Sequence, residues 1–146
     1  MKFKFRLDSL LHYRKRLLDE AQIKYRSAQA EVDSALLELQ SYYDASDNAR
    51  SLIYSRLQSG SGLAEVVQAD QHIEHLKIKV NLKRSEIREL MMKAEEFHEE
   101  MTEAARQTKI LEVLKEKKKE EHKKMMKKKE AKELDDLTSM RYGRVK

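Results

Sequence analysis

The stretch Gln58-Ser59-Gly60-Ser61-Gly62 decides the fold of this chain. No other place in the sequence combines small polar residues with two glycines, and glycine adopts left-handed backbone conformations at little cost. The 146 residues include no proline and only one further glycine, Gly143. Because almost nothing else would interrupt a helix, the sequence predicts two long helices joined by a turn at 58–62.

Apolar residues repeat with a seven-residue period on both sides of this turn. Alternating steps of four and three residues select fourteen positions in each segment, and twelve of each fourteen are apolar. Such a stripe keeps facing a partner helix only if the two helices supercoil, so the pattern indicates a coiled coil. We call these positions the seam. They are Leu7, Leu11, Arg14, Leu18, Ala21, Tyr25, Ala28, Val32, Ala35, Leu39, Tyr42, Ser46, Ala49 and Ile53, then Val66, Ala69, Ile73, Leu76, Val80, Lys83, Ile87, Leu90, Ala94, Phe97, Met101, Ala104, Thr108 and Leu111.

The predicted fold is all-α: a long two-helix antiparallel coiled-coil hairpin with an overhanging C-terminal helix. We expect residues 1–146 to form a single coiled-coil rod, with one helix at about 6–57 and a second at about 63–141. Either Ser61 or Gly62 should cap the second helix.

The expected register pairs residues across the turn whose numbers sum to about 121. Leu7 should then meet Leu114, where the apolar pattern of the second segment stops. Lys83 should lie opposite Glu38 within the seam. Residues 115–141 are expected to be unpaired, and Gly143 is expected to end the second helix.

Basic residues concentrate at both ends of the chain. Residues 2–26 hold eight Lys or Arg against three acids, and residues 115–146 hold thirteen against seven. Residues 27–114 hold ten against sixteen. Since a hairpin brings the two termini to the same end, the sequence predicts a basic terminal end and an acidic shaft, and the basic end should attract an acidic partner surface.

The lysine-rich stretch 115–133 has three interpretations. A solvated single helix supported by Glu–Lys pairs is the simplest. Non-specific binding to nucleic acid is a second, although interleaved glutamates and the lack of aromatic residues argue against it. Binding to an acidic membrane surface through Met125 and Met126 is a third, but two methionines make a thin apolar face. We therefore expect no nucleic-acid partner.

The sequence does not indicate catalysis. It has no cysteine, no glycine-rich phosphate loop and no nucleophile constellation. His72 and His75 lie three residues apart, but no third ligand has a fitting spacing. We expect no catalytic residue, no metal, no other cofactor and no small-molecule substrate. With no signal-peptide pattern and no long apolar stretch, a cytoplasmic location is expected.

Motifs at both ends of the chain carry a family resemblance. Phe5-Arg6-Leu7 precedes Leu10-Leu11 and Arg14-Lys15-Arg16, and Glu133-Leu134-Asp135-Asp136 precedes Arg141-Tyr142-Gly143-Arg144. Together with the chain length and the single glycine-marked turn, these motifs resemble the FliJ family of flagellar type III export proteins. The resemblance implies a non-enzymatic, cytoplasmic, stalk-like rod associated peripherally with the membrane-embedded export apparatus at the base of the bacterial flagellum.

The resemblance also implies partners and contact residues. The partners are a hexameric flagellar export ATPase of FliI type, whose assembly the rod promotes, the export gate protein FlhA, and export chaperones. The ATPase contact is expected at the terminal end and the gate contact near the start of the second helix. An injectisome stalk protein and a generic coiled-coil scaffold unrelated to secretion remain alternatives. The expected ATPase-binding residues are Phe5, Leu7, Arg14, Arg16, Arg141, Tyr142 and Arg144, and the expected gate-binding residues are His72, Ile73 and Leu76.

Overall fold

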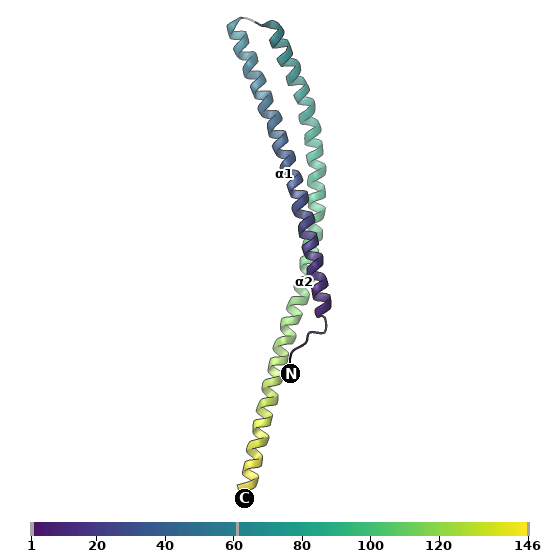
Figure 1. The fold of residues 1–146 in the computed structure, drawn as a ribbon, viewed down its shortest axis with the longest axis vertical. Helices are drawn as coiled ribbons and strands as arrows, with labels where there is room; N and C mark the ends of the chain where they lie inside the picture. The colour runs from purple at the N-terminus through teal and green to yellow at the C-terminus, as the bar shows by residue number, and fades with distance from the viewer. Residues whose placement is uncertain (1, 61, 146) are drawn as a thin grey trace. The chain divides into compact units, whose positions relative to one another are not determined.

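The computed structural model describes residues 2–60 and 62–145, with side chains described through residue 143. Two α-helices account for most of them: α1 spans Asp8–Ser59 and α2 spans Leu63–Val145 (Figure 1). No strand occurs within the described residues. The two helices pack against each other, which confirms the predicted all-α helical hairpin.

The helix ends differ from the expected ones. Both ends of α1 lie two residues further along the chain, and α2 continues through Gly143 to Val145. Positive φ angles among the described residues occur only at Gly60 and Gly62, so Gly143 has an ordinary helical conformation. A glycine inside a helix costs only about 1 kcal/mol relative to alanine. One such residue therefore does not end a helix of 83 residues.

The seam is where the chain buries its side chains. Every seam position is buried or half-buried, and each fully buried side chain among the described residues occupies a seam position. Leu11 and Val32 are the most completely buried, at 2% exposure each. Small residues keep the helices close: Ala28 and Ala94 pack with Val32. The seven-residue pattern thus correctly predicted which faces of the helices meet.

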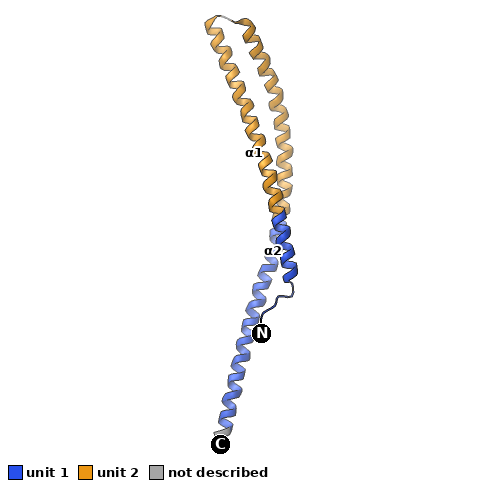
Figure 2. Cartoon of the chain, viewed as in Figure 1, with its two compact units in different colours: residues 1–20, 102–146 blue, residues 21–101 orange. Residues whose placement is uncertain are grey.

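The contacts divide the chain into two compact units (Figure 2). Unit 1 comprises Met1–Glu20 with Thr102–Lys146, and unit 2 comprises Ala21–Met101. Within unit 2 the two helices run antiparallel, and Lys83 Nζ lies 2.6 Å from Glu38 Oε2. This ion pair confirms the register expected across the turn. Hydrogen bonds to Glu38 and Glu86 raise the pKa of Lys83, so this seam lysine remains charged.

The turn uses both glycines in the conformation that favours them. The φ angles of Gly60 and Gly62 are 70° and 84°. The Gly62 carbonyl accepts a hydrogen bond from Val66 N at 3.0 Å, which makes Gly62 the N-cap of α2. Glu65 lies in the first turn of α2 and forms an ion pair with Arg56 at 2.7 Å. Ser61, the other expected cap, lies outside the described residues.

Candidate protein interaction site

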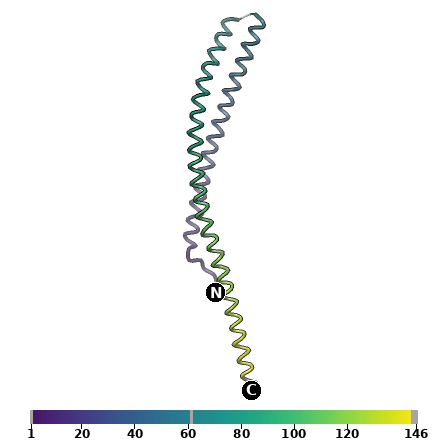
Figure 3. Tube along the Cα trace, turned by 180° about the vertical axis from the view of Figure 1, so that it is seen from behind, coloured from purple at the N-terminus to yellow at the C-terminus, as the bar shows by residue number. Residues whose placement is uncertain are grey.

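The N-terminal residues 2–7 form no helix and lie beside α2 in unit 1 (Figures 1 and 3). We call them the strap. Their exposure alternates: Lys2, Lys4 and Arg6 are exposed, whereas the three apolar residues between and after them are half-buried. Successive side chains of an extended segment point in opposite directions, so the sequence KFKFRL gives this strap an apolar side and a basic side.

The strap and α2 together line an open groove of about 750 Å³. The ring of Phe3 packs on the ring of His122, with 5.6 Å between centroids. The chain segment from residue 115 onward was expected to be unpaired, but the N-terminal residues contact α2 at Lys115 and His122, while Met125 at the far end of the groove stays 64% exposed. The physical reason is that half-burying the apolar side chains of the strap on α2 removes part of their surface from water. The groove is lined by Lys2, Phe3, Lys4, Phe5, Arg6, Leu7, Leu114, Lys118, Glu121, His122 and Met125.

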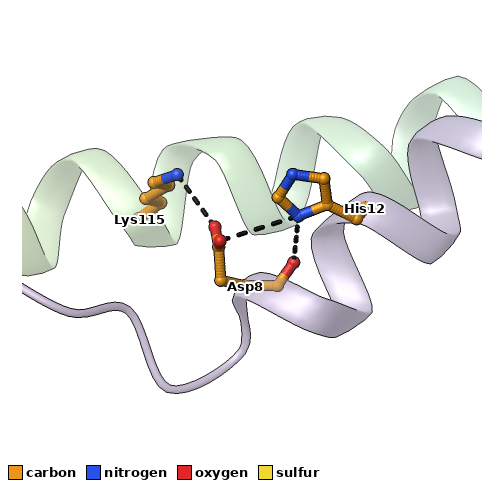
Figure 4. A network of polar contacts seen from close by, with 3 residues as sticks. All are labelled: Asp8, His12 and Lys115. Atoms are coloured by element: carbon orange, nitrogen blue, oxygen red, sulfur yellow. Dashed lines mark hydrogen bonds and ion pairs between the residues drawn. The ribbon is translucent and has the colours of Figure 1, made fainter.

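A polar contact at Asp8 fixes the junction between the strap and α1 (Figure 4). Lys115 Nζ on α2 donates a hydrogen bond to Asp8 Oδ1 at 2.9 Å. His12 Nδ1 lies 2.8 Å from the backbone carbonyl of Asp8 and 3.6 Å from Oδ2 of its carboxylate. The amide of Asp8 donates to the carbonyl of Phe5 at 3.1 Å. Asp8 therefore links the strap, the first turn of α1 and α2.

Replacing Asp8 with Asn is expected to loosen the strap. The hydrogen bond from Lys115 lowers the pKa of Asp8, so its contribution to stability is present above the unfolded-state pKa of about 4 and is lost as pH falls through the lower folded-state value. Amide hydrogen exchange of residues 5–12 at neutral pH should be faster in Asp8→Asn than in the wild-type chain. The exposed Asp19→Asn serves as the control, and equal exchange in both variants would contradict this assignment.

The structure brings only some of the predicted ATPase-binding residues together. Phe5 and Leu7 both line the groove. Arg16 is exposed, with its guanidinium 5.8 Å from the centroid of the Tyr13 ring. Arg14 is half-buried, and it helps Arg106 and Gln107 to lower the pKa of Glu103 to about 2.

The C-terminal members of the predicted set lie further along α2. Arg141 is sixteen residues beyond Met125, about 24 Å along a helix axis, so it does not line the groove. Arg141 and Tyr142 are both exposed, and Tyr142 retains 74% of its surface. The side chain of Arg144 lies outside the described ones. The candidate site is therefore a groove near the strap and a separate exposed segment at the end of α2.

A protein-family comparison covers both ends of the chain, where the motifs lie. The model described as "Flagellar FliJ protein" matches residues 3–146, which include the strap and the end of α2. The chain belongs to the FliJ family. Comparisons with curated proteins and with solved structures gave no match. FliJ proteins are non-catalytic components of the flagellar export apparatus, so this chain is a component of that apparatus.

The residues expected to contact the export gate do not form one exposed surface in this FliJ-family chain. His72 is exposed, but Ile73 and Leu76 retain only 6% and 4% of their surface. Both are seam residues that face the other helix, so a partner can reach only His72 of the three while the hairpin is closed. The gate contact expected around these three residues therefore stays a prediction, in which His72 is the accessible member.

The groove also contains residues that the terminal motifs did not indicate. Phe3, Lys118, His122 and Met125 were not among the predicted contacts. The signal for Phe3 was the strict alternation of basic and apolar residues in KFKFRL. Lys118, His122 and Met125 lie on α2, and no sequence pattern marks them as groove residues. They line the groove because the strap lies beside them, and the helical pattern does not predict the position of the strap.

Neither a metal site nor a membrane-spanning helix occurs in the part of this FliJ-family chain that the structure describes. Through the described ranges, no group of three or more His, Asp or Glu side chains could hold a metal ion. In the same residues, neither helix contains a segment apolar enough to cross a membrane.

Proposed function

We propose that this FliJ-family chain is a stalk that binds the hexameric export ATPase of FliI type through unit 1. The exposure of Tyr142 is the main observation that supports this proposal. It is an aromatic residue with 74% of its surface exposed, and it lies beyond the seam, so packing within the hairpin does not account for it. Tyrosine and arginine are enriched among the residues that contribute most of the binding energy at protein interfaces, and Arg141 precedes Tyr142 directly.

The exposed positive charges of unit 1 also support binding to a protein with an acidic surface. Lys2, Lys4 and Arg6 are exposed on the strap, and Arg16 is exposed on α1. Exposed cations of one sign accelerate association with an acidic surface and make binding sensitive to salt. An acidic opening in the ATPase ring would provide such a surface.

In this proposal the stalk promotes assembly of the ATPase ring. A stiff, asymmetric rod that binds the assembled ring better than single subunits shifts the equilibrium towards the ring by mass action. The gate protein FlhA would contact unit 2 at the exposed face that contains His72, and export chaperones would be further partners. Membership of the FliJ family favours this function over an injectisome stalk or a generic scaffold.

Capture by the ATPase tests the proposal. Immobilised export ATPase from the same organism should retain the intact chain at low salt and less of it at high salt. The double variant Arg141→Glu, Tyr142→Ala should reduce capture at least tenfold, because it removes an exposed cation and an aromatic contact. Tyr54→Ala, at an exposed tyrosine of unit 2, is the matched control and should be captured normally. Absence of capture of the intact chain at low salt would contradict ATPase binding.

A further inference from the structure

Near its C-terminal end, α2 presents a short acidic and apolar segment. Residues 133–140 contain Glu133, Asp135 and Asp136 and no Lys or Arg. Leu134, Leu137 and Met140 in this segment keep 64%, 59% and 66% of their surface exposed. We call residues 133–140 the acidic leucine segment. It differs from the lysine-rich residues 115–132 that precede it.

No part of unit 1 covers this segment. All side chains described from residue 127 to residue 143 are exposed. The segment cannot fold back onto its own groove, because α2 is one continuous helix and Leu134 lies about 14 Å beyond Met125 along its axis. Any partner that covers the exposed leucines therefore comes from another chain.

The groove between the strap and α2 is apolar and basic, which complements the acidic and apolar side chains of the acidic leucine segment. Its apolar lining includes Phe3, Phe5 and Leu114. Four basic side chains line it against a single acidic one, Glu121; the basic residues are Lys2, Lys4, Arg6 and Lys118. A concave apolar groove with a basic rim suits an acidic peptide segment that carries bulky apolar side chains. A flat membrane surface fits it less well, because the two phenylalanines are half-buried and do not project.

We propose that the groove binds the acidic leucine segment of a second copy of this chain. If the two α2 helices lie antiparallel, the segment of each copy reaches the groove of the other, and both contacts form at once by two-fold symmetry. The same arrangement places Asp135 and Asp136 of one copy against the lysine-rich residues 117–129 of the other. The dimer joins complementary charges and covers leucines that are exposed in the single chain.

Disulfide trapping tests this arrangement directly because the native chain has no cysteine. Met125→Cys and Leu134→Cys, each in the full-length chain, are mixed and oxidised. We expect a cross-linked dimer that contains one copy of each variant. Leu57→Cys, at an exposed leucine of unit 2, replaces Leu134→Cys in the control mixture and should give little cross-linked product with Met125→Cys.

Sedimentation velocity supplies the second measurement. The wild-type chain should form a dimer at tens of micromolar, and Leu134→Glu with Leu137→Glu should sediment as a monomer with unchanged helical circular dichroism. Asp135→Lys with Asp136→Lys should weaken the dimer at least tenfold, whereas Leu57→Glu should leave it intact.

Three results would overturn the proposal. One is a wild-type chain that stays monomeric with no specific cross-link. Another is a dimer that survives Leu134→Glu with Leu137→Glu but dissociates in Leu57→Glu, which would place the interface near the turn. The third is a monomer that cosediments with phosphatidylglycerol vesicles but not with phosphatidylcholine vesicles, which would assign the basic surface of unit 1 to an anionic membrane rather than to a second copy. None of these readouts depends on capture by the ATPase, so the two proposals can fail separately.

Discussion

Val32→Asp is expected to unfold the hairpin or to lower its melting temperature by tens of degrees. Val32 is 2% exposed and packs with Ala28 and Ala94, which offer no partner for a carboxylate. Burying an unpaired charge costs on the order of 4 kcal/mol or more. That is a large fraction of the stability of a typical small protein, which is about 5–15 kcal/mol.

Thermal unfolding followed by circular dichroism at 222 nm measures this effect. Ser34→Asp is the matched control, because Ser34 is an exposed residue two positions along α1 and receives the same new charge. Its melting temperature should change by only a few degrees. If Val32→Asp melted as Ser34→Asp does, position 32 would not lie in the seam.

Leu11→Ala is expected to destabilise the chain by about 2–5 kcal/mol, the usual cost of truncating a buried leucine. Leu11 is 2% exposed and is the most buried leucine of α1, while the adjacent Leu10 retains 39% of its surface. Leu10→Ala should therefore cost less than about 1 kcal/mol, as surface substitutions usually do. Urea unfolding of both variants measures the difference, and equal losses would show that α1 does not bury the face predicted by its apolar pattern.

The fold was predictable because one physical rule governs most of the chain. Two helices without a central core can bury apolar surface only along a seam, so a seven-residue pattern determines which side chains are covered. The register across the turn also predicted that the polar seam residue Lys83 lies opposite Glu38, and the two side chains form an ion pair. The glycine turn was predictable for a similar reason, since few other residues adopt the φ angles found at Gly60 and Gly62.

The candidate site was less predictable because the strap is not helical. Periodicity of 3.5 residues does not specify where a short extended segment lies, and the packing of Phe3 on His122 joins residues far apart in the sequence. The burial of Ile73 and Leu76, two of the residues expected near the gate contact, could have been predicted. Both belong to the seam pattern, so the sequence already contained the signal that they face the other helix.

The most direct test of the stalk function is the effect of the full-length chain on its ATPase. Purified export ATPase is mixed with an equimolar amount of the chain, and its hydrolysis rate and oligomer distribution are measured with and without the addition. We expect faster hydrolysis and a shift from monomers to hexamers, with neither effect from the Arg141→Glu, Tyr142→Ala variant. An unchanged rate and an unchanged oligomer distribution on addition of the wild-type chain would contradict the proposed function.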